Sequence, residues 1–294
     1  MTTKEYCYNV AGHCFSVLAG ENVDLAGELA HYAPFAVDPG TAAERVFRLR
    51  VVSEAELPVP AQLEEEFTQD DDGSQIRLCH TADGSYWFEF CLRDRLTGRM
   101  LAEPGYKSAT LSLISSPDFA VSNALMVMYA MSTAECGTAL FHAAVIGNGG
   151  RGYLFLGKSG TGKSTHARLW LKYVPGSELV NDDNPVVRVL DDGTVRVYGS
   201  PWSGKTPCYR NMDLPVGGFV QLAQAPQNEI RPLRGIETYA ALVSSISGQR
   251  WDRRIADGLH ETENALASRV RGWHLDCLPD EGAARLCFET VTKA

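Results

Sequence analysis

The feature that most constrains this chain is a glycine-rich stretch that begins at Leu154 and ends at Thr165. It reads Leu-Phe-Leu-Gly-Lys-Ser-Gly-Thr-Gly-Lys-Ser-Thr and matches the pattern G-x-x-x-x-G-K-[ST] at each fixed position. A short apolar run precedes the glycines, and helix-like periodicity follows Lys163. The order of strand, glycine loop and helix is the context in which this pattern binds phosphate. A plain turn is the alternative, but it needs neither the lysine nor the hydroxyl.

The residue types in this stretch suit a bound polyphosphate. Glycine lets the backbone bend so that several N–H groups point at one anion, and the start of a helix adds its positive dipole end. Lys163 would supply a full charge to the β- and γ-phosphates, and the Ser164 hydroxyl could ligate magnesium. The expected nucleotide-binding residues are Gly157, Lys158, Ser159, Gly160, Thr161, Gly162, Lys163, Ser164 and Thr165.

Two adjacent aspartates, Asp182 and Asp183, follow a short apolar strand predicted for Glu178 to Val180. Carboxylates at the end of a strand are the magnesium-binding complement that a phosphate loop requires. The second carboxylate can also serve as a general base. A helix cap or turn is the alternative interpretation. Which aspartate accepts a proton stays open, because a coupled pair near a metal need not have separable roles.

Three further side chains are candidates for the site. His142 interrupts an apolar run, Thr138 to Ile146, that predicts one fully buried strand, and it is either near the nucleotide or a hydrogen-bonded core histidine. Lys205 and Arg210 follow a predicted hairpin centred on Asp191-Asp-Gly. Both could contact a substrate or nucleotide phosphate, although a solvated loop lysine is the alternative for Lys205.

Composition excludes several classes of protein. The net charge of −9 argues against a nucleic-acid partner, because phosphate backbones require a basic surface. The eight cysteines form no C-x-x-C pair and hence no zinc signature. The start of the chain lacks an apolar signal segment, so we expect a reducing, cytoplasmic location. No uncharged apolar run approaches the length that crosses a bilayer, so we expect no membrane partner.

Patterning divides the 294 residues into two regions. Residues 1–116 are mostly strand-like, with alternation in segments such as Arg45 to Val52, and predict an antiparallel β-rich lobe. Residues 117–294 alternate predicted strands and helices and carry the glycine loop. The expected fold class is therefore α/β, with a mixed sheet and flanking helices around the nucleotide site.

The segment from His142 to Lys205 resembles the HPr kinase/phosphorylase family and the ATP-dependent phosphoenolpyruvate carboxykinases, whose nucleotide domains share a fold. In those families a histidine-bearing strand leads into a Gly-x-Ser-Gly-x-Gly-Lys-[Ser/Thr] loop, and a later strand ends in Asp-Asp. The matching residues here are His142, Gly157 to Ser164 and Asp182-Asp183. The resemblance implies a P-loop core of that fold. It also implies that the two aspartates divide the roles of magnesium ligand and general base, while His142 assists near the transferred phosphoryl group.

The chain also departs from both families. Thr165 stands where HPr kinases usually have glutamate, so the loop is closer to the carboxykinase form. Neither the HPr kinase signature stretch after the aspartates nor the carboxykinase set of lysine, histidine and arginine that holds manganese and oxaloacetate is present. The resemblance therefore indicates a divergent relative and leaves the acceptor open.

Three functions follow as hypotheses. The leading one is transfer of a phosphoryl group from ATP, with Mg²⁺, to a hydroxyl of a protein, peptide or small molecule, with Lys163 neutralising charge. A second is a nucleotide-responsive binding module without transfer chemistry, and a third is carboxykinase activity. The choice between ATP and GTP and the oligomeric state, including a homo-oligomer, stay open.

Overall fold

The computed structural model describes residues 4–21, 23–40, 44–71, 73–204, 206–248, 250 and 252–293. Lys205, one of the two predicted phosphate contacts after the hairpin, lies outside these residues. The chain forms two compact units, Met1–Thr133 and Ala134–Ala294. No helix within the described ranges is long and apolar enough to cross a membrane.

The first unit is built on a mixed sheet whose described strands run in the order β3-β1-β2-β4-β9-β8-β7-β6-β5. Their bounds are β1 Lys4–Val10, β2 His13–Ala19, β3 Ala36–Val37, β4 Arg45–Ser53, β5 Leu63–Asp71, β6 Ser74–Thr81, β7 Tyr86–Leu92, β8 Arg95–Ala102 and β9 Ser108–Leu113; two 3₁₀ turns are η1 Ala30–Phe35 and η2 Glu54–Glu56. The β2–β4 and β4–β9 pairs are parallel and the others are antiparallel. The lobe is β-rich as expected, but it is not purely antiparallel.

Helix α1 (Pro117–Thr133) belongs to this first unit. It packs on β4, β8 and β9, and a Cβ added at Gly98 of β8 would lie 2.8 Å from Cβ of Ala120. The Tyr129 hydroxyl donates a hydrogen bond of 3.0 Å to the Val10 carbonyl. The boundary expected at residue 116 therefore falls after this helix, because its apolar face is buried by the first sheet.

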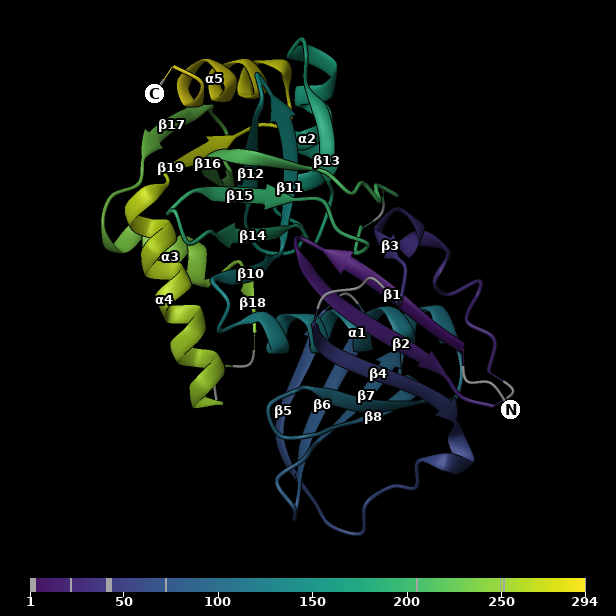
Figure 1. The fold of residues 1–294 in the computed structure, drawn as a ribbon. Helices are drawn as coiled ribbons and strands as arrows, with labels where there is room; N and C mark the ends of the chain where they lie inside the picture. The colour runs from purple at the N-terminus through teal and green to yellow at the C-terminus, as the bar shows by residue number, and fades with distance from the viewer. Residues whose placement is uncertain are drawn as a thin grey trace. The chain divides into compact units, whose positions relative to one another are not determined.

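The second unit carries the glycine loop on a second mixed sheet, with the described order β13-β11-β12-β16-β15-β14-β10-β18 and with β19 paired to β16 and β17 (Figure 1). The strands are β10 Thr138–Phe141, β11 Ala143–Asn148, β12 Arg151–Leu156, β13 Glu178–Asn181, β14 Val186–Val189, β15 Val195–Tyr198, β16 Asp213–Gln224, β17 Glu229–Pro232, β18 Ile246–Ser247 and β19 Gly272–Cys277. The helices are α2 Lys163–Tyr173, α3 Ile236–Val243, α4 Arg253–Arg269 and α5 Glu281–Val291. The predicted α/β class with mixed sheets is confirmed.

The apolar run around His142 forms two strands, not the single strand that the sequence predicts. Strand β10 pairs with β14 and β18, whereas β11 pairs with β12 and β13. The chain changes pairing partners at His142, whose own N–H donates to the Ser245 carbonyl at 2.7 Å. A continuous apolar run cannot reveal this change, because both strands are buried.

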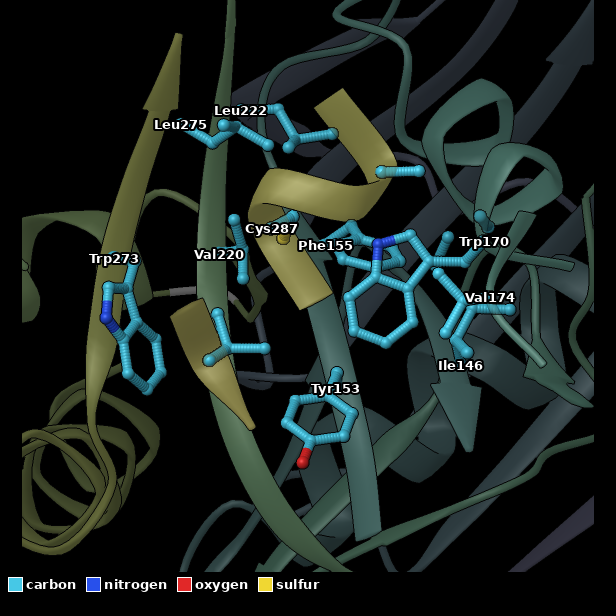
Figure 2. Packing of buried hydrophobic residues seen from close by; sticks show 14 residues of the cluster. Ile146, Tyr153, Phe155, Trp170, Val174, Val220, Leu222, Trp273, Leu275 and Cys287 are labelled. Carbon is cyan, nitrogen blue, oxygen red and sulfur yellow. The ribbon is translucent and has the colours of Figure 1, made fainter. Parts of the chain in front are cut away.

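Helices α2 and α5 cover β11, β12, β16 and β19 through one apolar cluster (Figure 2). Trp170 of α2 is fully buried, and its ring centroid lies 5.5 Å from that of Phe155 on β12 and 5.6 Å from that of Phe288 on α5. This packing fixes α2 against the sheet. The glycine loop, which joins β12 to α2, is therefore held at both ends.

We expect Trp170→Ala to lower the free energy of unfolding by about 3–5 kcal/mol, because it removes a fully buried indole and leaves a cavity. Leu171→Ala, at an adjacent side chain that is 41% exposed, should change stability by less than about 0.5 kcal/mol. Urea unfolding followed by circular dichroism measures both. Equal losses in the two variants would contradict the packing described for α2.

Candidate functional site

The glycine loop adopts a backbone that its glycines permit. Gly157 and Gly162 have φ of 149° and 109°, values that side chains with a Cβ rarely adopt. The loop is closed by Thr161, whose N–H and hydroxyl both donate to the Lys158 carbonyl, at 3.1 and 2.6 Å. Gln224, the last residue of β16, donates through its side-chain amide to the Gly160 carbonyl at 3.1 Å. The loop is thus stabilised by hydrogen bonds within itself and by one from the end of β16.

Backbone N–H groups of the loop are available to a ligand. Within the described ranges, the amides of Ser159, Gly160 and Gly162 donate to no other residue. Helix α2 begins at Lys163, so the positive end of its dipole lies at the same place. Unused donors at a helix start form a site for an anion such as phosphate.

Lys163 is buried inside this loop, with an exposed fraction of 7%. Its ammonium group donates to the carbonyls of Gly157 and Lys158, at 2.9 and 3.3 Å. Lys158, by contrast, is exposed. A buried ammonium group beside the loop amides places a full positive charge where water screens it poorly.

Strand pairing brings three predicted site segments to one edge of the sheet. Strand β11 lies between β12 and β13, with Ala143 opposite Leu156 and Val145 opposite Asn181. Because β11 is antiparallel to both neighbours, its start lies beside their ends. His142, the glycine loop and the Asp182-Asp183 pair therefore share this edge.

The two aspartates differ in environment. Asp182 is 4% exposed, and its Oδ2 accepts a hydrogen bond of 3.3 Å from the Thr206 N–H. Asp183 is half-buried; its Oδ2 accepts from the Asn184 side chain at 2.8 Å, and its Oδ1 lies 3.9 Å from Nε2 of His142. Asp183 is thus the more accessible carboxylate and is paired with the histidine.

Asn181 supports this pair and was not predicted as a site residue. It is fully buried, its side-chain amide donates to the Ser200 hydroxyl and the Trp202 carbonyl, both at 3.1 Å, and its Oδ1 accepts from the Asp183 N–H at 2.9 Å. The Ser200 hydroxyl donates to the Asn184 carbonyl at 2.6 Å. The sequence signal for this network is a polar residue at the end of an apolar strand.

A hollow of about 740 Å³ adjoins the glycine loop. One wall is formed by the loop and by His166 and Leu169 of α2, and the others by residues after β16 and after β19, including Ala225 and Leu278. Its volume is in the range of small-molecule sites. Three segments far apart in sequence form it, which is why the sequence analysis did not locate it.

His166 is a buried histidine in the wall of this hollow, with an exposed fraction of 2%. Burial lowers its pKa to about 4, so the ring is neutral at pH 7. Its Nε2 accepts from the Trp170 indole N–H at 3.2 Å, so we assign the ring proton to Nδ1. Nδ1 is buried and has no partner in the described part of the chain. His166 therefore contributes a neutral, buried ring to this wall, beside the polar side chains of Thr165 and Gln224.

Arg210 does not join the loop edge. Its guanidinium donates to the Leu179 carbonyl at 2.7 Å and to the Glu178 carboxylate at 2.8 Å, both at the start of β13. The aspartates follow the other end of that strand. In the described ranges no cluster of three histidine, cysteine or acidic side chains is arranged to hold a metal ion.

Comparison with known proteins adds no family. No protein-family model matches the chain, and no curated protein matches it significantly.

We expect the buried His166 to make stability depend on pH. The folded state keeps the ring neutral to about pH 4, whereas the unfolded chain protonates it near pH 6.5, so stability is full above about 6.5 and is lost as pH falls towards 4. The loss from this group should reach about 3 kcal/mol. Urea unfolding at pH 7.5 and pH 4.5 measures it, and His166→Gln, which keeps an acceptor for Trp170, should lose less stability between the two. Parallel pH profiles for both proteins would contradict the assignment.

Proposed function

We propose that the chain transfers a phosphoryl group from Mg²⁺-bound ATP to a hydroxyl group. The observation that carries this proposal is the meeting of a buried loop lysine, free loop amides and an aspartate pair at one sheet edge. A plain turn between strand and helix needs none of these. Phosphoryl transfer, by contrast, depends mainly on positioning and on neutralising charge, and these residues supply both.

The phosphate chain would be held by the loop. The amides of Ser159, Gly160 and Gly162 and the start of α2 would donate to phosphate oxygens. Lys163 would exchange its carbonyl partners for the β- and γ-phosphates and neutralise the charge that develops on the transferred group. Its burial strengthens that interaction, because the surrounding dielectric is lower than in water.

The residues present fit a magnesium ion that travels with the nucleotide. Asp182 is a buried carboxylate with one long hydrogen bond, so it has lone pairs left for a cation, and Ser164 offers its hydroxyl at the start of α2. Two protein ligands suffice, because Mg²⁺ usually keeps several waters and phosphate oxygens. When bound, the ion would offset phosphate charge.

Asp183 is the better candidate for the general base. It is more exposed than Asp182, so an acceptor hydroxyl can reach it, and accepting the hydroxyl proton turns the oxygen into a nucleophile. His142 lies 3.9 Å from Asp183 and can help to orient the carboxylate. Asn184 and the buried Asn181 fix the same carboxylate through its side chain and its backbone.

The hollow beside the loop is our candidate for the nucleotide base. It begins at Gly160 to Gly162, where the phosphates would lie, and apolar side chains such as Leu169 and Leu278 could pack against a planar ring.

The first test is transfer of label from γ-labelled ATP to serine-containing peptides and cell extract. We expect Lys163→Met to abolish transfer and to weaken nucleotide binding, because it removes the buried charge. Lys172→Met, at an exposed lysine in the last turn of α2, should leave transfer within about twofold of the unsubstituted protein. If both variants keep full transfer activity, the loop has no role in the mechanism.

Asp183→Asn in the same assay separates the role of general base from that of nucleotide binding. We expect transfer to fall by about 10²–10⁴, the usual contribution of a general base, with ATP affinity retained. Tight ATP binding without transfer to any acceptor would instead support the nucleotide-responsive module. ATP-dependent decarboxylation of oxaloacetate would support the carboxykinase hypothesis.

A substitution that fills the hollow should discriminate base from phosphate contacts. We expect Ala225→Trp to weaken ATP binding by about tenfold or more while leaving the affinity for tripolyphosphate unchanged, since the loop itself is intact. Gln227→Trp, on the same connection but outside the lining, is the control. Isothermal titration measures all four affinities, and equal effects on both ligands would place the base elsewhere.

A further inference from the structure

Four arginines gather where β12 and β19 begin, at the opposite end of these strands from the glycine loop. Arg151 opens β12, Arg271 precedes β19, Arg269 ends α4 and Arg234 stands shortly before α3. They line two hollows, of about 540 and 360 Å³, and the segment 269–271 lines both. The two hollows therefore adjoin, and we name them together the arginine groove.

The arginine groove has no acidic counterpart of its own. Among the residues that the structure describes, no aspartate or glutamate lines either hollow. The four arginines are exposed, and within the described part of the chain none forms an ion pair; Arg269 donates only to the Ala265 carbonyl, at 3.4 Å. Guanidinium groups that line adjoining hollows repel one another, so an anion that binds among them lowers the electrostatic free energy.

Other arginines of the second unit do have acidic partners. Arg196 pairs with Asp213, and Arg231 pairs with Glu237 at 3.1 Å. The whole chain carries a net charge of −9, which disfavours unspecific attraction of anions. On such a chain, the arginine groove would select its ligand through local charge complementarity.

Other groups in the groove suit a peptide. Tyr153 lines the smaller hollow, and Figure 2 shows its hydroxyl pointing away from Phe155 and Trp170. Leu233 and Trp273 add apolar surface to the larger hollow. Arginine binds carboxylates through two parallel hydrogen bonds, and the hydroxyl can donate to a carbonyl.

We propose that the arginine groove binds an acidic peptide segment of a partner protein. Arg234 lines only the larger hollow and Arg151 only the smaller, so a single small anion would leave part of the charge unmatched. A segment with several Asp or Glu residues presents carboxylates along its length and matches both hollows. This binding lies at the edge away from the loop, so it does not depend on the proposed phosphoryl transfer.

Fluorescence anisotropy of the full chain with a labelled octapeptide of alternating Asp and Glu tests the proposal at low salt. We expect Arg151→Gln and Arg271→Gln each to weaken binding about five- to tenfold, and the double variant more. Arg253→Gln removes an equally charged side chain that is 94% exposed and pairs with Asp257, and it should have no effect. Circular dichroism checks that each variant is folded.

The controls decide the outcome. The matching Asn/Gln octapeptide should not bind, and raising the salt should weaken the acidic peptide, because exposed charges are screened. Tighter binding of tripolyphosphate or of a single-stranded oligonucleotide than of the acidic peptide, measured by competition, would overturn the proposal. Failure of the acidic peptide to bind would also overturn it. So would an equal loss of peptide affinity in the Arg151, Arg271 and Arg253 variants.

Discussion

The packing of α2 against the second sheet is the interaction on which the candidate site depends. Trp170 is fully buried against Phe155 of β12 and Phe288 of α5, and it also donates to His166. These contacts hold the start of α2 close to the end of β12, so the chain between them must turn within a few residues. Glycines with positive φ allow that turn, and the same turn leaves the amides of Ser159, Gly160 and Gly162 without a partner in the described ranges. The candidate anion site is thus a consequence of how the helix is anchored.

Differences in burial distinguish side chains of the same type in the candidate site. Lys163 and Lys158 belong to one loop, yet only Lys163 is buried, and its ammonium group donates to two carbonyls of that loop. Asp182 and Asp183 are adjacent, yet Asp182 is buried and Asp183 is half-buried, so in the proposed reaction an acceptor hydroxyl would reach Asp183. A phosphoryl-transfer site requires this kind of division, because one charge must neutralise phosphate while another must meet the incoming nucleophile. Sequence spacing alone could not distinguish the members of either pair.

Local patterns predicted much of the second unit. The loop motif, the helix from Lys163 and the hairpin around Asp191-Asp-Gly follow from short-range preferences, and the structure has each of them. What needs tertiary pairing was missed: the break at His142 depends on which strands lie beside it, and the hollow beside the loop draws its walls from three distant segments. The predicted boundary at residue 116 assigned helix α1 to the nucleotide-binding region, but this helix packs on the first sheet. Arg210 was predicted near phosphate from proximity in sequence, whereas its guanidinium pairs with Glu178.

Strand β12 joins the two anion sites that we propose. Arg151 opens it in the arginine groove, and Leu156 ends it at the glycine loop. Between them Tyr153 and Phe155 point into the same apolar cluster, where they pack against Trp170 with ring centroids 5.5 Å from the indole. Strand β12 is buried from Gly152 to Leu156, so it would set a fixed distance between a peptide anchored at its start and a phosphate held at its end. If the anchored partner also carries the acceptor hydroxyl, the segment between its acidic stretch and that hydroxyl must be long enough to pass around the sheet, so the length of this segment would itself select among acceptors.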